Sequence, residues 1–236
     1  MFGVLLLPAS AWAYRPFVST DAAVADPKEV EIELGYFNLE RTRHENTIAA
    51  PSVVLNYGVA KNLEIVGEFR LEMSPDVEIT DPALSLKGVV REGVLQDKPG
   101  LSVAVEAGLL LPSSLPGEPS VGFQAVGIVS GKLAPVTLHV NGGGGLDRAG
   151  RVFGIWGVIG ELPLHSRLRL VAEVNGETTQ GERPNNSALL GLIWQPTSKN
   201  VFLDAGVRRG ISHAAPDWQF TLGLTFGFSL RRSRDQ

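Results

Sequence analysis

The sequence predicts an all-β protein: a transmembrane, antiparallel, up-and-down β-barrel of about twelve strands, with about ten to fourteen compatible with the pattern. Three observations support this prediction. Segment after segment alternates apolar residues with small or polar ones, as strands with two different faces do. Many of these segments are longer than the roughly five or six residues of a soluble strand. The connections between them also alternate between long and short.

The stretch 217–230, DWQFTLGLTFGFSL, shows the alternation most clearly. One parity holds only large apolar residues, whereas the other holds only small or polar ones. The stretch is longer than the roughly 9–11 residues that a tilted strand needs to cross a bilayer. Aromatic residues near both ends, with aliphatic residues between them, match the interfacial girdles of membrane barrels. We therefore interpret 217–230 as the last membrane strand.

The same alternation recurs in earlier stretches of the chain. In 28–36 four apolar residues alternate with three glutamates and a glycine, and in 63–71 the polar parity carries charges of both signs. Such a strand fits between lipid and a wet lumen. In chain order, the earlier strands are expected at about 28–36, 51–58, 63–71, 82–91, 101–111, 121–131, 135–144, 152–162, 167–175, 186–194 and 201–208.

The expected connections differ in length between the two ends of the barrel. The longer, polar ones are 41–50, 73–81, 112–119, 145–150, 177–185 and 210–217. Those at 58–62, 131–134, 162–166 and 195–200 are shorter, and 91–100 is an exception. Long loops at one end, with short turns and both termini at the other, are typical of outer-membrane barrels.

Composition excludes several classes of protein. The chain has no cysteine, which removes disulfide scaffolds, cysteine-based zinc sites and thiol catalysis. The net charge is −4 and no basic stripe is present, so no nucleic-acid partner is expected. No run of about 18 apolar residues follows the N-terminal region, so no membrane-spanning helix is expected. We expect no cofactor and no metal.

A soluble lipocalin or β-sandwich would also alternate, with its apolar face turned inward. Three features favour the membrane barrel: a secretion signal, long strands, and a final strand that ends in aromatic residues. The polar parity is also rich in Gly, Ser and Thr, where a soluble surface would favour Lys and Glu.

The N-terminal residues 1–13, MFGVLLLPASAWA, are interpreted as a signal peptide cleaved after Ala13, because a short apolar core precedes a small-x-small pattern. No Lys or Arg precedes that core, which leaves the true start open. Residues 14–27 are expected to be a periplasmic lead-in, 28–230 the outer-membrane barrel, and 231–236 a periplasmic C-terminal tail. The expected location is the bacterial (Gram-negative) outer membrane.

The spacing Thr221-x-Gly223-x-x-Phe226-x-Phe228 resembles the C-terminal signal by which bacterial outer-membrane barrels are presented to their insertion machinery. A departure is the tail RRSRDQ. The segment 204–226, together with NYGVAKNLEIVGEF (56–69) and VEAGLLLP (105–112), resembles barrels of the MetA-pathway of phenol degradation family of outer-membrane transporters. The resemblance implies a porin-like channel or transporter for small solutes, aromatic or apolar ones among them. The implied partners are outer-membrane lipid, the barrel-assembly machinery and a small-molecule solute.

The residues expected to face the lumen are the charged ones of the polar parity. Two interpretations are open: the charges pair across strands and stiffen a narrow barrel, or they form an electrostatic filter on a water-filled path. We favour the first, and expect Arg208 to pair with Asp204 at i and i+4 of one strand. The lumen candidates are Glu64, Glu68, Arg70, Lys87, Glu106, His139, Arg169, Glu173, Asp204 and Arg208.

An enzyme is not expected. His139 is the only histidine predicted within the wall, and a nucleophilic Ser–His pair could use Ser102, Ser120 or Ser130. No G-x-S-x-G pattern surrounds any of these serines. Three functions remain: a channel or transporter, a structural or lipid-interacting barrel with a filled lumen, and a barrel-sited lipid hydrolase.

Overall fold

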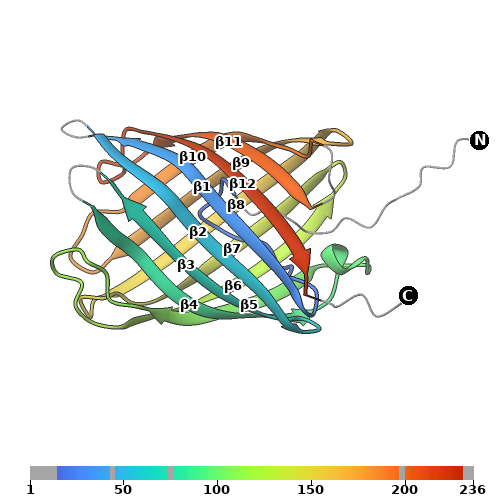
Figure 1. Ribbon diagram of the computed structural model, residues 1–236, viewed down its shortest axis with the longest axis horizontal. Coiled ribbons are helices and arrows are strands. Elements are labelled where there is room, and N and C mark those ends of the chain that lie inside the picture. The colour runs from blue at the N-terminus through green and yellow to red at the C-terminus, as the bar shows by residue number, and fades with distance from the viewer. Residues whose placement is uncertain (1–14, 43–45, 74–76, 197–199, 231–236) are drawn as a thin grey trace, which may run out of the picture.

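The structure, a computed structural model, describes residues 15–42, 46–73, 77–196 and 200–230. Within them, twelve antiparallel strands form one closed barrel (Figure 1). Each strand pairs with its neighbours in sequence, and β1 (Glu29–Arg41) pairs with β12 (Trp218–Ser229) to close the barrel. This confirms the predicted all-β, up-and-down transmembrane barrel fold. The predicted signal peptide 1–13 and tail 231–236 lie outside the described residues.

The remaining strands follow one another around the wall. They are β2 (Asn46–Ala60), β3 (Leu63–Glu72), β4 (Glu78–Arg91), β5 (Ser102–Leu110), β6 (Gly122–Leu133), β7 (Val136–Leu146), β8 (Val152–His165), β9 (Leu168–Thr179), β10 (Asn185–Trp194) and β11 (Val201–Gly210). A short 3₁₀ helix, η1 (Val94–Gln96), lies in the β4–β5 connection. No helix in the described part of the chain is long and apolar enough to span a membrane.

The two ends of the barrel differ, as expected. The connections that leave odd-numbered strands gather at one end, which we call the loop end. The other connections gather at the end where β1 begins and β12 stops, which we call the terminus end (Figure 1).

The first two strands extend further than their sequence pattern predicts, because each contains an irregularity. The register of β1 shifts between Gly35 and Phe37, so that the inward parity continues at Asn38. In β2 the register shifts between Ala49 and Ser52, around Pro51. Bulges insert a residue into a strand, and proline within sheets is confined to such places or to edges. The alternation is therefore interrupted in the sequence although the strand continues.

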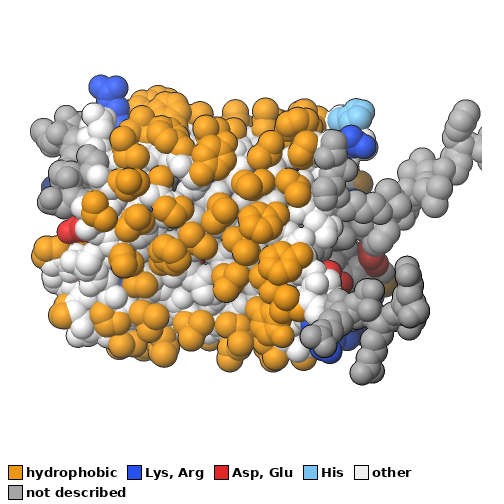
Figure 2. All heavy atoms as spheres, in the orientation of Figure 1, with side chains coloured by type: hydrophobic (Ala, Val, Ile, Leu, Met, Phe, Trp, Pro, Cys, Tyr) orange, Lys and Arg blue, Asp and Glu red, His pale blue; other side chains and the backbone are white. Residues whose placement is uncertain are grey.

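The outer wall is apolar and the inner wall is polar. Figure 2 shows hydrophobic side chains covering the wall between the two ends, with charged side chains near the ends. Large residues such as Leu86, Leu190 and Phe220 are exposed there. The inward parity instead buries charged residues, among them Glu64 and Glu173. This arrangement is the one that a bilayer outside and a polar lumen inside require.

The chain before β1 runs inside the barrel. Residues 15–26, which we call the inner segment, contact inward-facing side chains of the wall and pack two small apolar clusters. Phe17 packs against Val171, Ile193 and Phe202, while Ala22 packs among residues of β5 and β6. The expected position was the periplasm; the structure differs because the lumen offers this segment hydrogen-bond partners and apolar contacts.

Candidate functional site

The candidate site is the interior of the barrel, which consists of the inner segment and a cavity on its loop-end side. The inner segment makes hydrogen bonds or ion pairs with inward side chains of eight strands: β2, β3, β4, β6, β7, β9, β11 and β12. None of its residues belongs to a strand. The wall therefore holds it through side chains and not by extending the sheet.

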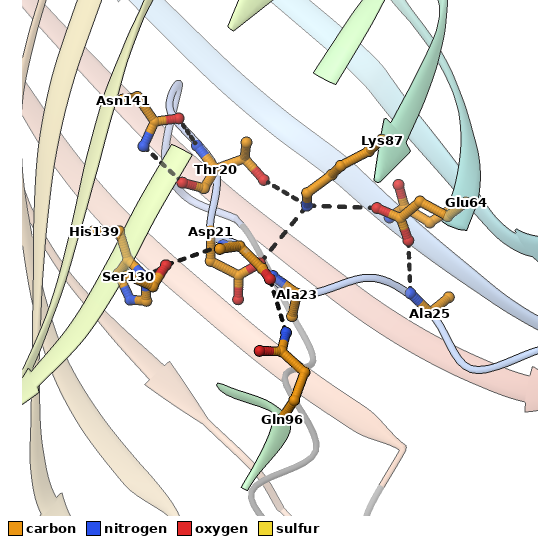
Figure 3. Close-up of polar contacts among 12 residues, drawn as sticks. Thr20, Asp21, Ala23, Ala25, Glu64, Lys87, Gln96, Ser130, His139 and Asn141 are labelled. Carbon is orange, nitrogen blue, oxygen red and sulfur yellow. Dashed lines mark hydrogen bonds and ion pairs between the residues drawn. The ribbon is translucent and has the colours of Figure 1, made fainter. Parts of the chain in front are cut away.

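Lys87 of β4 is the charged centre of this arrangement (Figure 3). Its Nζ lies 3.4 Å from a carboxylate oxygen of Glu64 in β3 and 3.6 Å from one of Asp21 in the inner segment. It also donates a hydrogen bond of 3.1 Å to the hydroxyl of Thr20. Both lysine and carboxylates are buried, and buried charges require such compensation.

Other wall residues bind the backbone of the inner segment. Glu173 accepts hydrogen bonds from the backbone N–H groups of Val18 and Ser19, at 3.1 and 2.8 Å. Asn141 binds both backbone groups of Thr20: its amide donates to the carbonyl at 2.7 Å and its oxygen accepts from the N–H at 3.1 Å (Figure 3). The asparagine amide thus offers one donor and one acceptor to the backbone of Thr20, as the backbone of a neighbouring strand would.

The same pattern continues toward β1. The Ser130 hydroxyl accepts from the N–H of Ala22 at 3.0 Å, and Glu64 accepts from that of Ala25 at 2.6 Å. Gln96 in η1 donates to the carbonyl of Ala22 at 2.9 Å. This contact explains the unusually long connection 91–100, which folds against the inner segment from the terminus end.

Arg15 binds the wall where the barrel closes. Its guanidinium donates to the Ser52 hydroxyl of β2 at 2.8 Å and to the Thr221 hydroxyl of β12 at 2.7 Å. Its Nε lies 3.8 Å from the carboxylate of Asp204 in β11.

Several inward positions of the wall are glycines, and they lie against the inner segment. A Cβ at Gly58 would overlap the backbone of Asp26, and one at Gly157 would overlap the hydroxyl of Ser19. A Cβ at Gly191 or at Gly206 would lie 3.2 Å from the ring of Pro16. Glycine in a strand often marks close approach of another backbone, and here that neighbour is the inner segment.

A cavity of about 810 Å³ lies on the loop-end side of the inner segment. Residues from Phe17 to Ala25 form part of its wall, and Asp147, Glu182 and Pro216 line it near the loop end. The inward residues nearest the terminus end, such as His139 and Thr225, are not among the described residues that line it. The inner segment is therefore the floor of the cavity.

Carboxylates outnumber cations on the wall of the cavity. The basic lining residues are Arg15, Lys87, Arg148, Arg151 and Arg208, and each lies within ion-pair distance of a carboxylate. The acidic lining residues are Asp21, Glu31, Glu33, Glu64, Glu68, Asp81, Glu106, Glu118, Asp147, Glu177 and Glu182. Eleven acidic groups against five basic ones give the cavity an excess of negative charge.

The loop end is held by Arg148. Its guanidinium donates to the backbone carbonyls of Leu111 and Pro82 at 2.6 and 3.0 Å, which ties the β5–β6 and β7–β8 connections to strand β4. Nearby, the carboxylate of Asp147 accepts hydrogen bonds from the backbone N–H groups of Ala149 and Arg151 in the same turn. Desolvation acts to raise the pKa of Asp147, but hydrogen bonds from the backbone and guanidinium of Arg151 outweigh it and lower that pKa.

All ten lumen candidates lie on the inward parity of their strands. Five of them line the cavity: Glu64, Glu68, Lys87, Glu106 and Arg208. Arg70 pairs with Glu40 and Glu72 near the loop end, and Arg169 pairs with Glu161 near the terminus end. Within the described residues, no group of three or more His, Asp and Glu is arranged to hold a metal ion.

One expected pair was wrong. Arg208 does not pair with Asp204; it donates to Glu173 of β9 at 2.6 Å, and both side chains are buried. Residues at i and i+4 of a strand are about 13 Å apart, whereas inward residues of nearby strands can meet. Asp204 instead lies close to Arg15.

A Ser–His–Glu cluster is present, but it is placed for a structural role. Ser130 Oγ lies 2.8 Å from His139 Nδ1, and His139 Nε2 lies 3.5 Å from Glu161. Ser130 is 0% exposed and its hydroxyl already accepts from Ala22. A catalytic serine must reach its substrate, and neither Ser130 nor His139 lines the cavity. The geometry therefore does not support the lipid-hydrolase alternative.

The residues of the expected insertion signal divide between the two faces of β12. Thr221 and Gly223 face inward beside Arg15, whereas Phe228 is exposed on the outer wall. Their recognition by an assembly machinery remains a prediction.

The sequence analysis missed Asn141, Ser130, Gln96 and Ser52 as ligands of the inner segment. The sequence did contain a signal, the abundance of Gly, Ser, Thr and Asn on the inward parity. The prediction gave more weight to the charged residues of that parity.

The fold is that of outer-membrane channels and porins. An outer membrane channel from Pseudomonas putida F1 superposes with a TM-score of 0.61 at 9% sequence identity, over 87% of this chain and 97% of that one. The KdgM porin gives 0.60 at 8%, over 85% and 99%, and the NanC porin 0.59 at 7%, over 84% and 98%. At these identities the similarity shows the fold alone. The sequence matches no protein-family model and no curated protein.

Proposed function

We propose that this protein is an outer-membrane channel for small solutes. The observation that carries the proposal is the cavity of about 810 Å³ inside a closed barrel, lined by charged and polar side chains and reaching the loop end. Outwardly apolar, inwardly polar barrels with such an interior form solute paths across outer membranes. The similarity of the fold to channels and porins supports the same class.

The finer proposal concerns the solute. The resemblance to the MetA-pathway of phenol degradation family, which stays a proposal, implies aromatic or apolar solutes. Val126, Phe153 and Ile155 form an apolar part of the cavity wall, which would accommodate such a group. Many other lining residues are charged or polar, so we expect solutes that combine an apolar part with a charged or polar one.

The test is single-channel conductance of the refolded mature chain, from Tyr14, in a planar bilayer. Folding is checked first by heat-modifiable gel mobility. Solute-dependent changes in current would support the proposal. A folded and inserted barrel that stays silent, both as the intact chain and after release of the inner segment, would contradict it.

A second candidate is a structural or lipid-interacting barrel without transport. The inner segment favours it, because Phe17, Ala22 and the groups around Lys87 fill the lumen near the terminus end. A folded and inserted barrel that conducts no ions in the bilayer experiment would be consistent with this second candidate.

A further inference from the structure

We propose that residues 15–26 are a releasable plug: a tethered peptide that binds the barrel interior mainly through its backbone and closes the terminus end of the channel. The proposal rests on the channel function above, and adds to it a binding site for an extended peptide backbone, occupied by the protein's own chain.

The first argument is the chemistry of the contacts. Seven backbone groups of the plug bind wall or turn side chains: the N–H groups of residues 18, 19, 20, 22 and 25, and the carbonyls of residues 20 and 22. No strand ladder includes residues 15–26. The plug can therefore leave without breaking a hydrogen bond between wall strands.

The second argument is that the charges of the wall stay compensated when the plug leaves. Glu173 keeps Arg208 at 2.6 Å, and Lys87 keeps Glu64 at 3.4 Å. Removing one partner of a buried ion pair is strongly unfavourable, but plug release leaves these two pairs intact. Asp204 is the exception, because its ion-pair partner in the described residues is Arg15.

The third argument is the shape of the wall. Inward glycines lie where the plug approaches most closely, and at Gly58 the obstacle to a side chain would be the plug's own backbone at Ala25 and Asp26. Gly67 on the next strand lies on the outward parity with Ile65 and Phe69, away from the plug, and has nothing within 4 Å of its ideal Cβ. The pair Gly58→Ala and Gly67→Ala therefore adds the same methyl group with and without pressing on the plug.

The experiment uses the absence of cysteine from the chain. A thiol introduced by Ala22→Cys reports the plug, since Ala22 is fully buried. A second thiol at Ser130→Cys, whose Oγ lies 3.0 Å from the Ala22 nitrogen, allows both to be bridged by dibromobimane, which fluoresces after reacting with two thiols. Labelling by a polar maleimide and bilayer conductance are measured on the same proteins.

We expect bridging in the otherwise unmodified chain. We expect Gly58→Ala to raise both maleimide labelling of the Ala22→Cys thiol and the conductance several-fold, with Gly67→Ala unchanged. Bridging in the Gly58→Ala background should abolish the added current. Asn141→Ala, which removes both hydrogen bonds to Thr20, provides a second route to release if Gly58→Ala does not fold.

The outcomes separate the plug from the channel. If labelling rises but no protein conducts, the plug is releasable and the channel function is wrong. If bridged and unbridged proteins conduct alike, or if neither variant raises labelling, the plug proposal is wrong, while any current still supports a channel.

Discussion

At the scale of single residues, two kinds of carboxylate share the lumen. Glu64 forms an ion pair with Lys87, and Glu173 forms one with Arg208. These two carboxylates therefore contribute little net charge to the lumen. Glu68 and Glu106 line the cavity, and the ion pairs among the described residues include neither of them. Rings or clusters of Asp and Glu favour cations in channels, so these two residues are the ones expected to act on passing ions.

We predict that Glu68→Gln with Glu106→Gln reduces the cation preference of the channel, because it replaces two carboxylates of the cavity lining by neutral amides. The reversal potential in a KCl gradient should move toward zero, and the effect should weaken at high salt, where screening is stronger. Glu29→Gln, outside the cavity lining, is the matched control. An unchanged reversal potential in the double variant would contradict the prediction.

The same residues show how far sequence reasoning reaches at this scale. A charge on the polar parity of a membrane strand must face the lumen, so all ten lumen candidates could be placed. Their partners could not, because pairing depends on strand register and barrel shear, which bring Arg208 to Glu173 and not to Asp204. The Ser130–His139 contact is likewise a consequence of the β6–β7 register.

At the scale of elements, regular strands were predictable and the inner segment was not. A period of two identifies strands such as β12 without any tertiary information. Residues 15–26 have no period, and their conformation depends on ligands that come from eight different strands. The long β4–β5 connection is an exception in the sequence pattern for the same reason, because its residue Gln96 donates a hydrogen bond to the inner segment.

β12 is also the element on which membrane assembly is expected to depend. We predict that Phe228→Ala lowers the fraction of chain assembled in the outer membrane several-fold, because it removes the final aromatic of the insertion signal. Leu222→Ala, which also truncates an exposed apolar residue of β12, is the control. The measurement is heat-modifiable mobility of outer-membrane fractions; equal loss in both variants would show that the signal is not specific.

At the scale of the whole molecule, the apolar outer wall should report depth in the bilayer. We predict that Leu86→Lys lowers the free energy of unfolding in lipid vesicles by about 2–4 kcal/mol, whereas Val90→Lys costs about 0–1 kcal/mol. Both residues are exposed on β4, but Val90 lies next to its last residue at the terminus end. Denaturant titration of vesicle-inserted protein measures the difference, and equal costs would contradict a membrane-spanning wall.

The position of Arg15 has a consequence for the closure of the barrel. β1 is the closing strand, and Arg15 donates to Ser52 and Thr221 on β2 and β12, its two neighbours. Docking of the inner segment and pairing of β1 with β12 are therefore linked, and linkage is reciprocal: each stabilises the other by the same free energy. Docking of the inner segment should therefore slow amide hydrogen exchange along β1 and β12. A variant that weakens the pairing of β1 with β12 should destabilise docking of the segment by the same free energy.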